Sequence, residues 1–229
     1  MSASKALEDY LKIIYKLEGS CVPDKGVQTS QIAERLCISQ ASVSNMLKRL
    51  AEQNYISYAP YYGVSLTEAG RKIALNMVRK HRVLELYLVE RLGYSWDEVD
   101  EEAEVLEHAI SDTLTNRMWE DLGRPTHDPH GSPIPTLSGK VEVQNLKPLT
   151  DITINCCVTV RRIKNRSPEE LRYLANIGLT TGVSLTIKNT APLNGPLLVE
   201  VNGAEFHAID YRLAMALLVE YCKESLSEK

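Results

Sequence analysis

The sequence has few cysteines and no arrangement of them that indicates a thiol-based site. Its five cysteines are odd in number, Cys156 and Cys157 are adjacent, and no pair has the C-x-x-C spacing. A disulfide framework and a thiolate zinc site are therefore both disfavoured.

Long apolar runs are also missing. No stretch approaches the run of about 18 uncharged apolar residues that a membrane span needs, and residues 1–5 lack the apolar core of a signal peptide. We therefore expect a cytoplasmic protein with no membrane partner. With 229 residues, of which 44% are hydrophobic, the chain can form one large or two to three small domains with real cores.

Charge is distributed unevenly along the chain. Residues 1–72 hold nine basic and seven acidic residues, residues 73–140 hold seven and thirteen, and residues 141–229 hold ten of each. Although the net charge is -4, the mildly basic first part allows an anionic partner and the acidic middle part allows a cationic one.

Two short helices joined by a tight turn are predicted between residues 29 and 53. Ser39 can cap the second helix, which buries Val43 and Leu47 and turns a polar face outward. Gln, Asn and Ser can bond base edges while Lys and Arg meet phosphates, so this face suits the major groove. An ordinary helical hairpin with a polar face is the alternative. The residues expected to contact DNA are Thr29, Ser39, Gln40, Ala41, Ser42, Ser44, Asn45, Lys48, Arg49 and Tyr61.

Residues 55–58 and 62–66 read as two strands of a hairpin that follows the second helix. With a first helix over residues 4–18, they predict a winged helix-turn-helix domain over residues 1–72. Tyr61 at the hairpin tip is expected to meet the sugar-phosphate backbone, or else to pack locally.

The middle of the chain is predicted to be helical, with helices over residues 71–92 and 96–121. In the second of these, Glu104, Glu107 and His108 stand at i, i+3 and i+4 and converge on one arc, beside an apolar stripe that could form a dimer seam. The plain alternative is a solvated acidic face with a chance histidine. On the first helix, His81 and Glu85 are neighbours at i and i+4, which an ion pair also explains.

The last third is richer in strands. Strands near residues 152–163, 183–188, 197–201 and 205–209, with short glycine-containing turns, predict a small β-barrel, followed by a final helix from Tyr211 to Tyr221. A proline-rich segment, residues 126–135, precedes this part. Its His127 and His130 allow a metal site, but we interpret them as turn residues.

Three separated segments resemble one family. Residues 8–15 (EDYLKIIY), 79–85 (RKHRVLE) and 101–112 (EEAEVLEHAISD) are similar to the diphtheria-toxin-repressor family of metal-dependent transcriptional regulators, as is PHGSPIP at 129–135. The resemblance covers the whole chain, because residues 178–182 and the last elements resemble the SH3-like, ferrous-transport-A-type domain of longer members.

The resemblance implies the fold and the domains. It implies a mainly α protein with β structure: a winged-helix DNA-binding domain (1–72), a helical metal-binding and dimerisation domain (73–140) and an SH3-like domain (141–229). It further implies a homodimer that binds a palindromic double-stranded operator and represses metal-uptake genes once a divalent metal is bound. Position by position, the metal ligands it implies are Asp9, His81, Glu85, Asp100, Glu104, Glu107 and His108.

The residues at these positions favour manganese. In iron-responsive members of the family that the chain resembles, methionine stands at the position matching Asp9 and cysteine at the position matching Glu104. This chain has carboxylates at both. Oxygen donors with one imidazole suit Mn²⁺, with Fe²⁺ as the alternative. Lys12 stands at the position where two-domain manganese regulators of the resembled family have a glutamate ligand. A lysine there argues against a two-metal cluster. The cations of residues 161–166 are poor ligands, which argues against a ligand from the C-terminal domain.

Two other classes of function are weighed against this reading. One is a winged-helix regulator that senses a non-metal ligand through its C-terminal domain. The other is a carboxylate-bridged metal enzyme, but its bundle needs Glu-x-x-His on two helices and the chain offers no second copy. We therefore expect neither enzymatic activity nor a small-molecule substrate.

Overall fold

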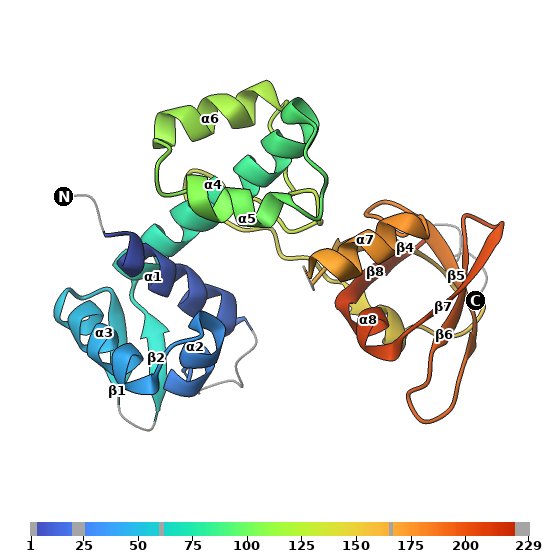
Figure 1. The fold of residues 1–229 in the computed structure, drawn as a ribbon, viewed down its shortest axis with the longest axis horizontal. Coiled ribbons are helices and arrows are strands. Elements are labelled where there is room, and N and C mark those ends of the chain that lie inside the picture. Colours follow the sequence, from blue (N-terminus) through green and yellow to red (C-terminus); the bar gives the residue numbers. More distant parts are fainter. Residues whose placement is uncertain (1–3, 20–25, 60–61, 165–166, 223–229) are drawn as a thin grey trace. The chain divides into compact units, whose positions relative to one another are not determined.

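The computed structural model describes residues 4–19, 26–59, 62–164 and 167–222. The chain divides into two compact units. The first comprises residues 1–81, 107–110 and 135–140, and the second comprises residues 82–106, 111–134 and 141–229. Each unit is described on its own (Figure 1).

The first unit is built around a winged helix-turn-helix. Its helices are α1 (Lys5–Glu18), α2 (Thr29–Leu36) and α3 (Gln40–Glu52), and its hairpin is β1 (Ile56–Ala59) paired with β2 (Gly63–Leu66). Figure 1 shows the hairpin beside these helices in the blue part of the chain. The predicted helices and strands of this region are confirmed.

Local signals explain these elements. The Ser39 side chain accepts a hydrogen bond from Ser42 N at 3.2 Å and so caps α3 as expected. Thr29 is the first residue of α2, and the residue before it, Gln28, is the N-cap, where the Gln31 side chain accepts from Gln28 N at 2.9 Å. The start of β2 needs glycine, because a Cβ at Gly63 would lie 2.6 Å from the Gly26 carbonyl oxygen and its φ is +93°.

One apolar core holds the first unit together. Leu11 and Ile14 of α1 and Leu47 and Leu50 of α3 are buried in it, with Val64 of the hairpin. The same core is extended by the start of α4 (Glu68–Leu92), whose first turn is closed by a hydrogen bond from Gly70 N to Thr67 Oγ1 at 3.1 Å.

The long helix predicted over residues 96–121 is wrong. The chain forms α5 (Val99–Leu106), then a turn, then α6 (Asp112–Asp121). The Ser111 hydroxyl accepts from Leu114 N at 3.1 Å, which caps a new helix. The predicted apolar stripe is divided accordingly: Val99 and Ala103 are buried, whereas Leu114 is exposed.

The C-terminal part of the second unit is an antiparallel six-stranded sheet with the order β3-β8-β4-β5-β6-β7. Figure 1 shows α7 and α8 beside it in orange and red. Its core includes Leu149, Val160, Ile187 and Leu213. The elements are β3 (Lys147–Pro148), η1 (Leu149–Asp151), β4 (Cys157–Ile163), α7 (Pro168–Asn176), β5 (Ser184–Thr190), β6 (Leu197–Val201), β7 (Glu205–Ile209), α8 (Tyr211–Ala216) and β8 (Leu217–Tyr221).

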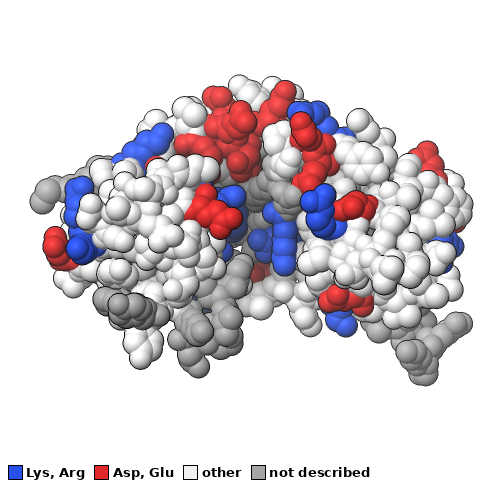
Figure 2. Space-filling view, turned by 60° about the horizontal axis from the view of Figure 1, so that its bottom comes forward, with Lys and Arg blue, Asp and Glu red and all other residues white. Residues whose placement is uncertain are grey.

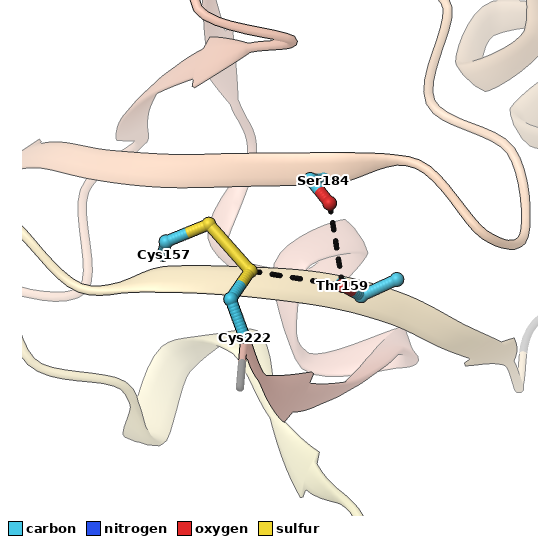
Figure 3. The surroundings of a disulfide bond; sticks show 4 residues. All are labelled: Cys157, Thr159, Ser184 and Cys222. Carbon is cyan, nitrogen blue, oxygen red and sulfur yellow. Dashed lines mark hydrogen bonds between the residues drawn. A yellow bond between two sulfur atoms is a disulfide. The ribbon is translucent and has the colours of Figure 1, made fainter. Parts of the chain in front are cut away.

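The predicted final helix is correct only in its first half. Its second half is the strand β8, because the apolar run Leu217 to Val219 is buried between β3 and β4. This pairing places Cys222 opposite Cys157 of β4, with Cα atoms 5.6 Å apart, and a disulfide joins them (Figure 3). This single bond corrects the expectation drawn from cysteine number and spacing, which disfavoured disulfides, and it depends on β8 forming where a helix was predicted.

The predicted architecture is confirmed: an N-terminal winged helix-turn-helix, a helical middle part and a C-terminal β-sheet domain. The domain boundaries at residues 72 and 140 stay predictions. Among the described residues, no helix is long and apolar enough to cross a membrane.

Candidate metal centre

The turn after α5 presents two of the predicted ligands to α1 within the first unit. Glu107 and His108 follow the last residue of α5, and Lys80 of α4 holds this turn by donating to the Ile110 carbonyl oxygen at 2.9 Å. Because the helix ends at Leu106, Glu107 and His108 do not share a helical arc with Glu104 as predicted. Turn geometry positions them instead.

His108 is fixed by two residues of α1. Its Nδ1 lies 2.7 Å from a carboxylate oxygen of Glu8, and its Nε2 lies 2.9 Å from Asp9 Oδ1 and 3.6 Å from Glu107 Oε1. An ionised carboxylate can only accept, so Nδ1 donates to Glu8. This leaves the lone pair of Nε2 facing Asp9 and Glu107.

These three residues fit a divalent cation. Asp9, Glu107 and His108 each offer a ligand atom, and the three atoms lie within 4.8 Å of one another. His108 Nε2 is buried and makes no hydrogen bond. A buried nitrogen without a hydrogen-bond partner carries a desolvation penalty that a bound cation would remove. An imidazole whose other nitrogen donates to a carboxylate is also the usual arrangement of a metal-binding histidine.

Lys12 of α1 occupies the other side of Glu107. Its Nζ lies 2.8 Å and 2.7 Å from the two Glu107 oxygens and 3.2 Å from His81 Nδ1, and the lysine is buried. His81 Nδ1 is itself 2.8 Å from Glu107 Oε2. An ammonium group therefore neutralises the carboxylate of Glu107 where the resemblance would otherwise place a second ligand.

The ionisation of Glu107 reflects this environment. Burial on its own would raise the pKa of the carboxyl group, but the hydrogen bond from His81 and the positive charge of Lys12 oppose it, and the net effect lowers the pKa. Glu107 is therefore ionised at neutral pH although it is completely buried.

The remaining predicted ligands belong to the second unit. Glu85 is buried on α4, and Asp100 and Glu104 are half-buried on α5. A carboxylate oxygen of Glu85 lies within 4.8 Å of one of Asp100. The structure thus brings Asp9, Glu107 and His108 together, with His81 beside Glu107, while the roles of Glu85, Asp100 and Glu104 as metal ligands stay predictions.

Glu8 is a residue of the candidate centre that the sequence analysis missed. It orients the imidazole of His108 from 100 positions away along the chain. Only its place next to Asp9 on the same helix hinted at a role.

The outer face of α3 carries the predicted DNA contacts. Gln40, Ala41, Ser42, Asn45 and Lys48 are exposed, as are Ser39 and Arg49. Ser44 and Thr29 are half-buried, and the Ser44 hydroxyl donates to the Gln40 carbonyl oxygen at 2.9 Å. Tyr61 lies outside the described residues.

Charge on the surface is grouped. Figure 2 shows a dense group of Asp and Glu side chains on the face it draws. The acidic excess in the sequence lies in residues 73–140, with thirteen acidic and seven basic residues. Bound cations would offset part of this excess and so reduce its repulsion of phosphate groups.

Three family models match consecutive parts of the chain. Residues 3–64 match the iron dependent repressor N-terminal DNA binding domain, residues 67–136 match the iron dependent repressor metal binding and dimerisation domain, and residues 147–221 match the FeoA domain. Together with the exposed α3 face and the polar centre at His108, they identify a metal-dependent, DNA-binding transcriptional repressor, which is not an enzyme.

Curated proteins that are similar to this chain over nearly its full length show the family to which the repressor belongs. The iron-dependent repressor IdeR of Mycobacterium bovis is 30% identical over 93% of this chain and 96% of its own length. The diphtheria toxin repressor of Corynebacterium efficiens is 30% identical over 93% and 94%. The chain belongs to this family of iron-dependent repressors, as its resemblance to the diphtheria-toxin-repressor family predicted.

Solved structures with similar folds include manganese regulators. A manganese-dependent transcriptional repressor in complex with manganese shares 38% identity, covers 94% of this chain and 100% of its own, and superposes with a TM-score of 0.86. The manganese regulator SloR shares 32% identity, with coverage of 97% and 100% and a TM-score of 0.75.

Proposed function

We propose that the protein is a manganese-activated repressor, which binds a palindromic operator as a homodimer and controls metal-uptake genes. The observation that carries this proposal is the buried Nε2 of His108, which makes no hydrogen bond and faces Asp9 and Glu107. The centre joins α1, the first helix of the winged helix-turn-helix, to the turn after α5. A metal is thereby able to act on the part of the chain that reads DNA.

The side chains around the centre prepare it for a cation. Glu8 keeps hydrogen on Nδ1 of His108 and so keeps the lone pair on Nε2. Lys12 and His81 keep Glu107 ionised. Asp9, Glu107 and His108 would hold a divalent ion there, whose positive charge would favour one relative placement of α1 and the turn after α5.

Helix α1 connects this centre to the wing. At its N-terminal end it carries Glu8, Asp9 and Lys12. At its C-terminal end, Glu18 accepts a hydrogen bond from Leu66 N at 2.8 Å and pairs with Arg71 at 2.5 Å. A change in the position of α1 is therefore transmitted to β2, and ligand binding at one end biases the DNA-reading geometry at the other.

Manganese is the proposed metal and Fe²⁺ the alternative. The centre offers carboxylate oxygens and one imidazole, with Glu104 proposed as a further oxygen donor, and no sulfur. Such hard donors suit Mn²⁺, whereas sulfur would favour softer ions. Similar solved structures include a manganese-dependent repressor in complex with manganese, while the curated relatives are named for iron.

DNA recognition is assigned to α3 and the wing. The exposed Gln40, Ser42 and Asn45 are proposed to meet base edges, while Lys48 and Arg49 meet phosphates. A twofold dimer then binds half-sites whose centres are about one helical turn, or a multiple of it, apart.

The test is metal-titrated DNA binding under anaerobic conditions. Duplexes are first selected from a random pool with Mn²⁺-loaded protein, and binding is then followed by fluorescence anisotropy with Mn²⁺, Fe²⁺ or Zn²⁺. We expect Mn²⁺ to strengthen binding by about tenfold or more, and His108→Gln to remove this effect. His127→Gln serves as the matched control, because His127 lies outside the centre. Equal binding with and without metal contradicts the proposal.

A further variant addresses the choice of metal. Glu104→Cys introduces a softer donor, so the response should shift toward Fe²⁺ relative to Mn²⁺. An unchanged order of metal responses would count against Glu104 as a ligand, without affecting the result for His108.

A further inference from the structure

The disulfide between Cys157 and Cys222 lies outside the centre at His108 and has no part in the function proposed above. It joins β4 to the residue that follows β8, within the second unit. Disulfides are rare in compartments that hold DNA, because thiols are kept reduced there, and those that form are usually transient and redox-sensing. A disulfide in a DNA-binding repressor is therefore better explained by a reversible bond than by a permanent cross-link.

Backbone pairing alone brings the two cysteines together. Val158 of β4 lies opposite Tyr221 of β8. The pairing continues by one position, since Cys222 N donates to the Cys157 carbonyl oxygen at 3.1 Å. The two Cα atoms are 5.6 Å apart, close to the separation of about 5.5 Å that hydrogen-bonded antiparallel pairs have without any cross-link. The bond can therefore form and break without a movement of either strand.

The disulfide lies on the face of the sheet that is turned away from the core. In β4, the buried Val158 and Val160 point into the core and alternate with Cys157 and Thr159, which are half-buried. Cys222 is half-buried as well. The bond is therefore on the side from which a small thiol in solution can approach.

A chain of hydroxyl groups ends at one of the two sulfur atoms (Figure 3). The Thr159 oxygen lies 3.7 Å from Cys222 Sγ and 3.3 Å from the Ser184 oxygen. A sulfur atom in a disulfide carries no hydrogen and can only accept, so Thr159 donates to Cys222 and keeps a lone pair that can accept from Ser184. The same hydrogen bond stabilises a thiolate at Cys222, which makes this sulfur the better leaving group.

We propose that Cys157 and Cys222 form a reversible redox site, which exchanges with small thiols and disulfides and controls how firmly β8 is held. A thiolate RS⁻ attacks Cys157 Sγ, the S–S bond breaks, and Cys222 leaves as a thiolate that Thr159 stabilises. A second RS⁻ attacks the outer sulfur of the mixed disulfide and displaces Cys157. The two cysteine thiolates take up the protons that the small thiols released, so two RSH become RSSR while the disulfide becomes two thiols. Oxidation by RSSR is the reverse sequence.

The effect of reduction falls on the C-terminal sheet. The cysteines are 65 positions apart, and the segment that they close contains the strands from β4 to β8. Closing such a segment lowers the entropy of its unfolded chain and so stabilises the fold. Since β3 pairs with Leu218 and Val219, the last residues of β8, Glu220 and Tyr221, rely on their pairing with β4. This end of β8 should open more often in the reduced protein.

Thiol titration of the full-length protein tests the reversibility of the site. Metal-free protein in chelator is equilibrated with mixtures of reduced and oxidised glutathione and quenched in acid. Each cysteine is then assigned by differential alkylation and peptide mass spectrometry. Cys157 and Cys222 should change together, in one two-electron step that runs in both directions. Cys156 is the matched control, because it is a free thiol that packs against the core and should not follow the pair.

Three results of this titration would overturn the proposal. A pair that stays oxidised in every mixture is a permanent cross-link. A pair that stays reduced in every mixture forms no redox site. Modification of the two cysteines in separate steps would mean that each reacts on its own.

The role of Thr159 is tested by the rate of reduction. Thr159→Val removes the hydroxyl group and should slow reduction by glutathione by about fivefold, the equivalent of one hydrogen bond. Thr159→Ser, which keeps the hydroxyl, should restore the wild-type rate. Equal rates in wild type and Thr159→Val would overturn the assignment of Cys222 as the sulfur that leaves.

Hydrogen exchange followed by mass spectrometry tests the control of β8. Amides of Leu217–Tyr221 should exchange faster in reduced than in oxidised wild type, while those of α1 should exchange at the same rate in both. Cys157→Ser cannot form the bond and should behave like reduced wild type under both conditions. Equal exchange of β8 in the two states of the wild-type protein would overturn the proposed control, whether or not the variant folds.

Discussion

The imidazoles of His108 and His130 are held in the same way but differ in their access to solvent. Each donates from one nitrogen, His108 to Glu8 and His130 to the Trp96 carbonyl oxygen, and each turns its other nitrogen toward carboxylates. Around His108, the Asp9 side chain keeps 29% of its surface exposed. Around His130, the side chains of Glu85 and Asp128 have no exposed surface.

The difference bears on the exchange of solvent and ions. The partly exposed carboxylate of Asp9 leaves a route by which an ion could enter and leave the centre at His108. The cluster around His130 is closed to water, and its hydrogen bonds hold the segment 128–132 in place.

The largest effect is expected from Glu107→Gln, which removes the carboxylate shared by Lys12, His81 and the centre. The buried ammonium of Lys12 then loses the negative charge of Glu107, so the free energy of unfolding of metal-free protein should fall by about 3–5 kcal/mol. Urea unfolding followed by circular dichroism measures this.

A double-mutant cycle provides the control for that prediction. Adding Lys12→Met removes the stranded charge, so the double variant should be less destabilised than the sum of the single variants. Additive losses would contradict the pairing of Lys12 with Glu107.

A smaller effect is expected from Glu8→Gln, which weakens the hold on Nδ1 of His108 without removing a ligand. Replacing such an orienting carboxylate typically lowers metal affinity by about 10–100-fold. Competition with a fluorescent Mn²⁺ chelator measures the affinity of the centre. An unchanged circular dichroism spectrum of the metal-free variant shows that the fold is intact, whereas a changed one would indicate general damage to the fold.

The smallest effect concerns pH. The folded protein holds the pKa of Glu107 below its value in the unfolded chain. The ionised Glu107 carboxylate therefore stabilises the fold fully at pH values above the unfolded pKa, and this contribution is lost as pH falls through the pKa of the folded state. The difference in stability between wild type and Glu107→Gln, measured with chelator, should therefore shrink as pH falls below the unfolded pKa of glutamate and through the lowered pKa of the folded protein. A difference independent of pH would show that Glu107 does not contribute through its charge.

Short-range patterns predicted the first unit well. The cap at Ser39, the apolar spacing of α3 and the alternation in β1 and β2 are all decided by neighbours along the chain. Pairing at long range was harder to predict. Lys12 and Glu107 are 95 positions apart, and no periodicity relates them. Spacing drew attention to Glu107 and His108, but their interpretation as metal ligands together with Asp9 came from the family resemblance.

The errors share a physical cause. The break at Glu107 was missed because the apolar pattern continues through it, although Ser111-Asp112 is a recognisable start of a helix. The Cys157–Cys222 disulfide was missed because Leu217 to Tyr221 can form a helix or a strand, and only burial between β3 and β4 decides which. His130 lies in a turn as expected, but its burial against Trp96 has no signature in the sequence.

Lys12 also affects the stability of the metal-free protein. A chelator can remove a bound ion, but it cannot remove an ammonium group attached to α1. With Lys12 in place, the buried carboxylate of Glu107 keeps a positive partner at any metal concentration. We therefore expect the metal-free protein to stay folded around Glu107, and we expect metal to act chiefly on Asp9, His108 and the elements that carry them.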